Sequence, residues 1–134
     1  MTRKISRAIT ITRIASLYNA SALILFLVPG MLAWLGVQEP YSSFWRVLPA
    51  LLASFGAITL WISASDIERL AIFPAWNGVI RLVFVVAVLA AGYLHTMGLF
   101  IILLVAGDLI IGLLTIMLVN RAVDKSFFQL ISNQ

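Results

Sequence analysis

Four long apolar segments constrain this chain more than any other feature. They cover residues 14–36, 47–65, 76–95 and 97–119. Each is close to the roughly 20 mostly apolar residues that a helix needs to cross a membrane. Only 10% of the 134 residues are charged and 63% are hydrophobic, whereas a soluble domain carries about 25% charged residues. We therefore predict an all-α polytopic membrane protein, a single domain over residues 1–134 with four transmembrane helices in an antiparallel bundle.

Polar or proline-containing stretches separate these segments. Gln38-Glu39-Pro40 is a polar turn with a helix breaker, and the charged residues 66–69 are interpreted as a solvated loop. Phe73-Pro74 is expected to end a short interfacial segment, because proline disfavours helix in the residue before it. The link at His95-Thr96 is so short that the last two helices must be antiparallel neighbours. Pro29-Gly30 predicts a kink within the first helix.

Lysine and arginine are distributed unevenly between the two sides that this topology creates. Cytoplasmic segments of membrane proteins carry an excess of Lys and Arg, so both termini are predicted to be cytoplasmic. Residues 2–13 and 121–131 mix basic and apolar side chains and are expected to form short amphipathic helices on the anionic inner leaflet, with frayed tails as the alternative. Only Arg46 falls on the outer side, and the other eight basic residues are Arg3, Lys4, Arg7, Arg13, Arg69, Arg81, Arg121 and Lys125.

Residue types that commonly carry redox and metal chemistry are scarce. The sequence has no cysteine, which excludes disulfides, thiolate metal sites and thiol redox chemistry. His95 is the single histidine, whereas a transmembrane haem with two axial histidines needs two. Asp66 and Glu68 would point to different sides of a helix. We expect no catalytic residue, no metal site and no evident cofactor; a bound lipid or quinone is left open. Whether the chain is an enzyme stays undecided, with the sequence leaning against it, and its few charges predict no nucleic-acid partner.

Asp108 is the most informative polar residue, because it lies in the middle of the apolar run from Met97 to Val119. A carboxylate at that depth is costly and needs a partner or a wet cavity. At about 1.5 Å per residue, Asp108 lies roughly 16 Å and Arg81 roughly 8 Å from the inner boundary. Arg81 is long enough to bridge most of that offset. Each helix offers a polar side chain to this inner half, so the predicted pocket consists of Arg81, Asp108, Asn19, Tyr18, Thr59 and Thr115.

This polar layer has two interpretations. In the structural one, Arg81, Asp108 and Asn19 form a buried lock that sets helix register, or Arg81 extends to the headgroups and leaves Asp108 neutral. In the functional one, Arg81 holds an anionic or carbonyl group, with Asp108 as its counter-charge or a proton acceptor.

Small residues mark a helix-packing face. In membranes such faces let helices approach closely. They are interpreted as intrachain packing, with docking of a second subunit as the alternative. A bundle this small leaves much lipid-exposed surface, so a homo-oligomer or other membrane subunits are expected partners beside the bilayer. The face comprises Ala50, Ala53, Ser54 and Ala57 in the second segment and Gly107 and Gly112 in the fourth.

Several short motifs together resemble the small DoxX-like four-helix membrane proteins. They are the basic start at residues 13–18, the Pro29–Gly36 exit from the first helix, Arg46 opening the second, Arg81 near the start of the third, and Gly107-Asp108 in the fourth. The resemblance implies a four-helix bundle in a bacterial cytoplasmic (inner) membrane. Some members are subunits of a quinone-linked oxidoreductase. Only Arg81 and Asp108 carry over as candidate site residues.

These observations lead to three functional hypotheses. The first is a non-catalytic accessory or scaffolding subunit of a membrane complex, favoured by the packing faces and the lack of catalytic groups. The second is a small carrier or proton-coupled transporter with Asp108 as the coupling acid. The third is a quinone- or lipid-binding module that uses the inner-leaflet pocket around Arg81 and Asp108.

Overall fold

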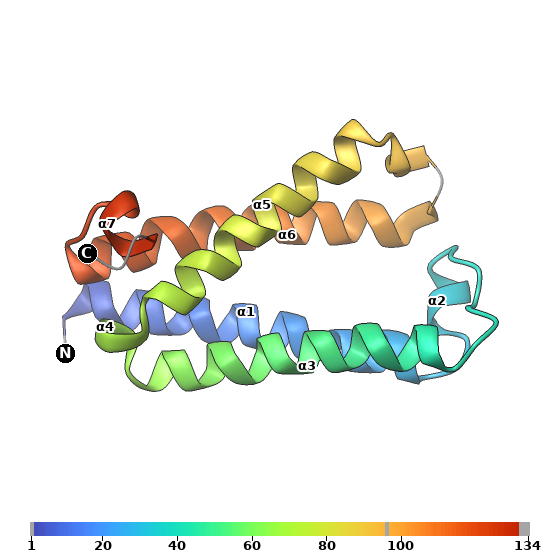
Figure 1. Cartoon of the computed structure of the whole chain (residues 1–134), viewed down its shortest axis with the longest axis horizontal. Coiled ribbons are helices and arrows are strands. Elements are labelled where there is room, and N and C mark those ends of the chain that lie inside the picture. Colours follow the sequence, from blue (N-terminus) through green and yellow to red (C-terminus); the bar gives the residue numbers. More distant parts are fainter. Residues whose placement is uncertain (1, 96, 132–134) are drawn as a thin grey trace.

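The computed structural model describes residues 2–95 and 97–131 and is helical almost throughout. Its long helices are α1 (Arg3–Leu27), α3 (Phe44–Ser65), α5 (Ile72–Ala90) and α6 (Gly98–Val123). All four are long and apolar enough to cross a membrane. The all-α class and the four antiparallel spanning helices are thereby confirmed (Figure 1).

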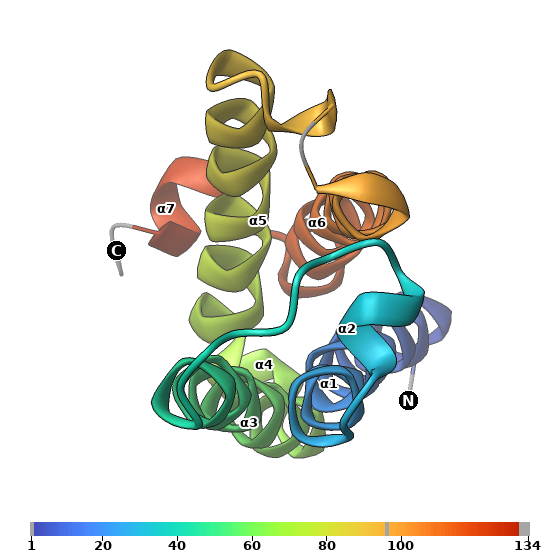
Figure 2. The ribbon, with the colours of Figure 1, turned by 90° about the vertical axis from the view of Figure 1, so that its right-hand side faces the viewer.

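The helices form two antiparallel pairs, α1 with α3 and α5 with α6 (Figure 1). Contacts between α1 and α6 join the pairs, whereas α3 and α5 touch each other little. Both termini lie at one end of the molecule, here called the terminal end. The opposite end carries the short helix α2 (Met31–Trp34) and is here called the α2 end. Figure 2, seen from the α2 end, shows α5 leaning away from α1 and α3. The pairs therefore diverge toward the α2 end.

The first helix differs from the predicted span over residues 14–36. It begins at Arg3, where Thr2 caps it by accepting from the backbone N–H of Ile5 at 3.5 Å. The N-terminal segment is thus helical, as expected, but continuous with the span. Pro29-Gly30 does not kink the helix but follows its end: Val28 is extended and Gly30 has φ 85°, a left-handed backbone that favours glycine.

Two loop predictions were wrong. Residues 66–69 are not a loop: α4 (Ile67–Leu70) begins there, capped by the carboxylate of Asp66, and Ile67 is buried, whereas the charged side chains are exposed as predicted. Pro74 does not end a segment either, because it lies in the first turn of α5. The backbone N–H groups of a first turn have no partner within the helix, so proline loses nothing there. As a result α5 begins four residues earlier than predicted.

The last two helices are joined by the 3₁₀ turn η1 (Tyr93–His95) and are antiparallel neighbours, as the short link predicts; Thr96 lies outside the described residues. After α6, Asp124 has φ 50° and α7 (Phe127–Ile131) folds back against α5 and α6. The terminal end is closed by a buried apolar cluster from five helices, namely Ala8, Ile67, Ala71, Ala75, Val119 and Leu130.

Candidate functional site

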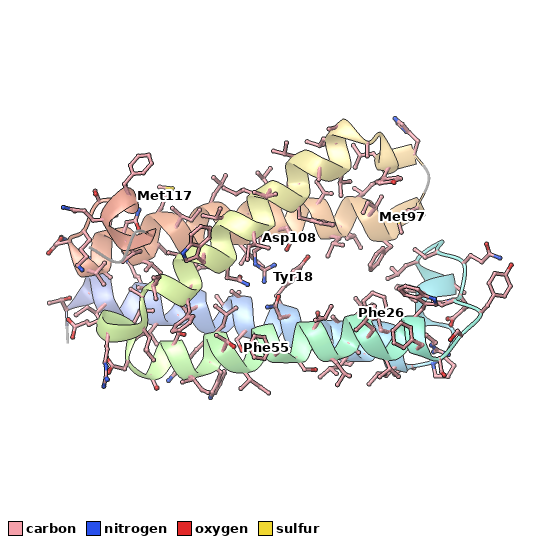
Figure 3. All side chains as sticks on the ribbon, in the orientation of Figure 1. Tyr18, Phe26, Phe55, Met97, Asp108 and Met117 are labelled. Atoms are coloured by element: carbon pink, nitrogen blue, oxygen red, sulfur yellow. The ribbon has the colours of Figure 1, made fainter. Side chains whose placement is uncertain are left out.

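Arg81 of α5 and Asp108 of α6 form a buried ion pair that joins these two helices, and Asp108 lies at mid-length on the side of α6 that faces Tyr18 of α1 (Figure 3). NH1 of Arg81 donates to Oδ1 of Asp108, and the two residues are only 6% and 7% exposed. A lone charge in a membrane interior is costly, and an opposite charge in contact reduces that cost. The pairing that the sequence suggested therefore exists in the structure.

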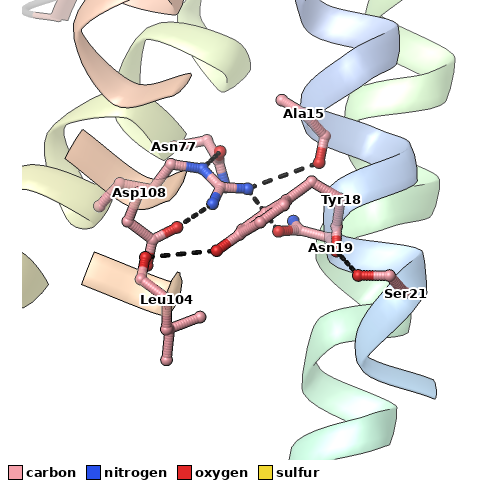
Figure 4. Close-up of polar contacts among 8 residues, drawn as sticks. Ala15, Tyr18, Asn19, Ser21, Asn77, Leu104 and Asp108 are labelled. Atoms are coloured by element: carbon pink, nitrogen blue, oxygen red, sulfur yellow. Dashed lines mark hydrogen bonds and ion pairs between the residues drawn. The ribbon is translucent and has the colours of Figure 1, made fainter. Parts of the chain in front are cut away.

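The guanidinium of Arg81 has further partners from α1 and α5 (Figure 4). Its Nε donates to Oδ1 of Asn77 at 2.8 Å, and NH2 donates to Oδ1 of Asn19 and more weakly to the carbonyl of Ala15 at 3.5 Å. The ring of Tyr18 lies with its centroid 5.0 Å from Cζ of Arg81, a cation–π contact. Arg81 thus links α1, α5 and α6 at one level of the bundle.

Local sequence explains why these side chains meet. Ala15, Tyr18 and Asn19 follow at helical spacing of three and four, so they share one face of α1. Arg81 lies about 14 Å from the start of α5 at the terminal end, and Asp108 lies about 15 Å from the start of α6 at the α2 end. Because the two helices are antiparallel, both residues fall near mid-length, and their side chains meet in the ion pair.

A cavity of about 950 Å³ extends from this polar group toward the α2 end. Helices α1, α2, α3, α5 and α6 all contribute to its wall. The wall is mainly apolar, with Phe26 and Met97 lying near the α2 end and Tyr18 and Asp108 at mid-length (Figure 3). Its lining residues Ile80 and Leu103 are 62% and 53% exposed, so the cavity opens onto the surface that lipid would cover. Its polar contribution comes chiefly from Tyr18, Asn19, Ser21, Asn77, Arg81 and Asp108.

Four of the six predicted pocket residues come together, and two do not. Tyr18, Asn19, Arg81 and Asp108 share the contacts above. Thr59 instead donates to the carbonyl of Phe55 within its own helix, and Thr115 is fully buried, with an Oγ1 that has no partner in the described part of the chain. Neither lines the cavity. The cavity also extends toward the α2 end, whereas the sequence placed the pocket in the half near the termini.

Sequence reasoning missed Asn77 and the carbonyl of Leu104, which accepts from the Tyr18 hydroxyl at 3.3 Å. Asn77 lies four residues before Arg81, the spacing at which side chains meet on a helix, and this signal could have identified it. The backbone carbonyl of Leu104 leaves no such signal in the sequence.

The predicted small-residue face is used mostly within the chain. Ala50 and Ala57 are buried, and the carbonyl of Ala57 accepts from the hydroxyl of Ser16 at 2.6 Å, which joins α3 to α1. Ser54 donates to the carbonyl of Ala50 at 2.7 Å, and Ala53 lines the cavity. In α6, a Cβ on Gly107 would overlap the ring of Tyr18, and Gly112 contacts α5.

The arrangement can hold a small polar head with an apolar body behind it. Among the described residues, no group of three or more His, Cys, Asp or Glu side chains could bind a metal ion.

No family model, no curated protein and no solved structure matches this chain. Fold and hydropathy define the class of protein: a multi-pass membrane protein with four spanning helices.

Proposed function

We propose that this protein binds an amphipathic molecule of the lipid phase in the cavity between its helix pairs. The single observation that carries the proposal is a mainly apolar cavity of about 950 Å³ whose polar contact is a buried ion pair. Ligand sites are typically clefts of about 300–1,000 Å³ with apolar walls and a few polar groups that orient the ligand. Its lipid-covered opening would admit a ligand from the bilayer rather than from water.

This proposal favours the lipid- or quinone-binding hypothesis over the accessory-subunit hypothesis. The small residues that could have docked another subunit are instead buried within the chain or line the cavity, as Ala57 and Ala53 do. What α3 presents outward is bulky and apolar, for example Phe55 at 74% exposure, and suits acyl chains. The carrier hypothesis has less support, because the cavity extends from the ion pair toward the α2 end, whereas the described residues at the terminal end form a buried apolar cluster.

The membrane and its orientation are part of the proposal. Both termini are placed on the cytoplasmic side of a bacterial inner membrane, because the basic residues gather at the terminal end. The cavity then lies mainly in the outer half of the bilayer. Membership among the DoxX-like proteins is likewise a proposal, supported by the motifs and by the four spanning helices.

Native mass spectrometry tests the proposal. The protein is extracted from membranes in a mild detergent, and we expect a retained lipid-phase molecule at close to one per chain. Ala87→Phe places a ring in the cavity wall and should abolish retention. Ala90→Phe is the matched control, because Ala90 is also exposed on α5 but does not line the cavity. Absence of any adduct on the unsubstituted protein, or equal loss in both variants, would contradict the proposal.

A further inference from the structure

The hydrogen-bonding capacity of Arg81 is nearly used up within the protein. A guanidinium has five N–H donors and no acceptor. Four of them are engaged, by Asn77, Asp108, Asn19 and the carbonyl of Ala15. An incoming carboxylate or phosphate normally binds arginine through two parallel N–H groups, and Arg81 cannot offer two without releasing a present partner. Of the two groups expected at Arg81, an anion is therefore disfavoured, whereas the remaining N–H could still donate to a carbonyl oxygen.

Asp108, by contrast, keeps an acceptor for the cavity it lines. Within the described part of the chain, its carboxylate accepts only the hydrogen bond from Arg81 to Oδ1, so Oδ2 has no donor. Beside it, the Tyr18 hydroxyl donates to Leu104 and leaves its oxygen as an acceptor. Asn77 also lines the cavity, and its amide nitrogen donates to none of the described residues. A hydroxyl, which both donates and accepts, could donate to one of the two acceptors and accept from the Asn77 amide.

The charges of Arg81 and Asp108 also determine which ligand head groups fit the cavity. Arg81 and Asp108 neutralise each other, and among the residues that the structure describes no other ionisable side chain except the tyrosines Tyr18 and Tyr93 lines the cavity. A bound carboxylate or phosphate would place an uncompensated negative charge beside Asp108, and an ammonium would leave a net positive charge beside Arg81. Both are costly in an apolar cavity. A neutral head adds no charge.

We propose, on the basis of the binding function proposed above, that the ligand is a neutral long-chain alcohol or phenol whose hydroxyl donates to Oδ2 of Asp108. The apolar body of the ligand fills the cavity toward the α2 end. Arg81 is a positioning residue that holds the carboxylate in place. The site therefore recognises a hydroxyl lipid and discriminates against lipids with acidic heads.

A series of probes with one chain and different heads tests this on the unsubstituted full-length protein in detergent. The probes are hexadecanol, hexadecyl methyl ether, hexadecanoic acid and hexadecylamine, titrated separately and detected as bound adducts by native mass spectrometry. Hexadecanol should bind about tenfold or more tightly than the other three, because a hydrogen bond to a charged group is worth that much. The ether is the sharpest comparison, since it keeps the oxygen acceptor and lacks the donor.

Asp108→Asn adds a test of the charge argument. The substitution leaves Arg81 without its counter-charge, so hexadecanoic acid should gain about tenfold or more relative to hexadecanol, and the preference for the alcohol should be lost. Asp124→Asn is the control for the change in net charge, because the Asp124 side chain is 82% exposed at the terminal end, and it should leave the order unchanged.

The outcomes separate the two proposals. If none of the four probes binds, the binding function and this inference are both overturned. Equal binding of alcohol and ether, or tighter binding of acid or amine, would overturn only the hydroxyl assignment and leave the cavity a binding site. The series on the unsubstituted protein decides the matter even where Asp108→Asn fails to fold.

Discussion

Gly78 and Gly112 bring α5 and α6 into backbone contact one turn from the ion pair, toward the terminal end: a Cβ at Gly78 would lie 3.0 Å from the carbonyl oxygen of Gly112. A Cβ at Gly112 would lie 3.1 Å from the carbonyl of Gly78 and 3.3 Å from Cβ of Arg81. The close approach leaves Arg81 directly opposite Asp108. Toward the α2 end the two helices carry larger side chains and diverge (Figure 1).

Gly112→Val should force α5 and α6 apart and lower stability by about 1–3 kcal/mol, the usual cost of overpacking. The measurement is the midpoint of thermal unfolding in detergent. Ala106→Val is the matched control, because Ala106 is on the same helix and exposed, so its midpoint should barely change. Equal effects of the two variants would show that the glycine contact does not hold the helices together.

Asp108→Asn should lower the unfolding midpoint, by roughly 3 kcal/mol in stability, because it leaves the buried charge of Arg81 without its counter-charge. Adding Arg81→Gln to that variant removes the orphaned charge and should recover a large part of the loss. The four proteins form a double-mutant cycle. If the double variant recovers none of the lost stability, the two charges do not stabilise each other.

Gly107→Ala should disturb Tyr18, because the added Cβ would lie 2.6 Å from its hydroxyl oxygen and 2.9 Å from its ring. We expect a loss of about 1–3 kcal/mol in stability and weaker retention of the bound molecule. Tyr18→Leu in the same chain removes the overlapping ring and should restore stability without restoring retention. Restored retention would argue against a role for Tyr18 in the site.

The proposed orientation predicts which single cysteines an impermeant maleimide labels in intact cells. The chain has no cysteine of its own, so each introduced thiol is the single reporter. Tyr41→Cys, in the loop before α3 and 98% exposed, should be labelled from outside. Ser6→Cys, exposed at the terminal end, should be labelled only after the membrane is permeabilised. The reverse labelling pattern would show that the topology is inverted and that the cavity lies in the inner half of the bilayer.

The sequence predicted the spans well, because a membrane demands long runs of apolar residues whatever their packing. It offered contact between Arg81 and Asp108 as one of two interpretations, because few charges lie deep in those runs, and left open that Arg81 extends to the headgroups instead. Pro74 misled the predicted start of α5: proline breaks helices in general but is tolerated in a first turn. Thr59 and Thr115 were assigned to the pocket by depth alone, and depth does not tell which way a side chain points.

The cavity itself could not be read from the sequence. It depends on how far α5 leans away from α1 and α3, and that angle follows from contacts between distant residues such as Gly78 and Gly112. Small residues along a helix permit another helix to approach closely, but they do not identify which helix packs there. Ala57 was therefore open to either an internal or an external partner until the structure placed it against α1.

The sparse contact between α3 and α5 leaves the ring of four helices incomplete. Acyl chains of the surrounding bilayer would cover that side, so the membrane would supply one wall of the cavity. Under the proposed binding function, occupancy would then depend on the thickness and order of the host membrane as well as on the protein's side chains. Ligand affinity would be a property of the protein and its lipids together, and a micelle and a bilayer are expected to give different values.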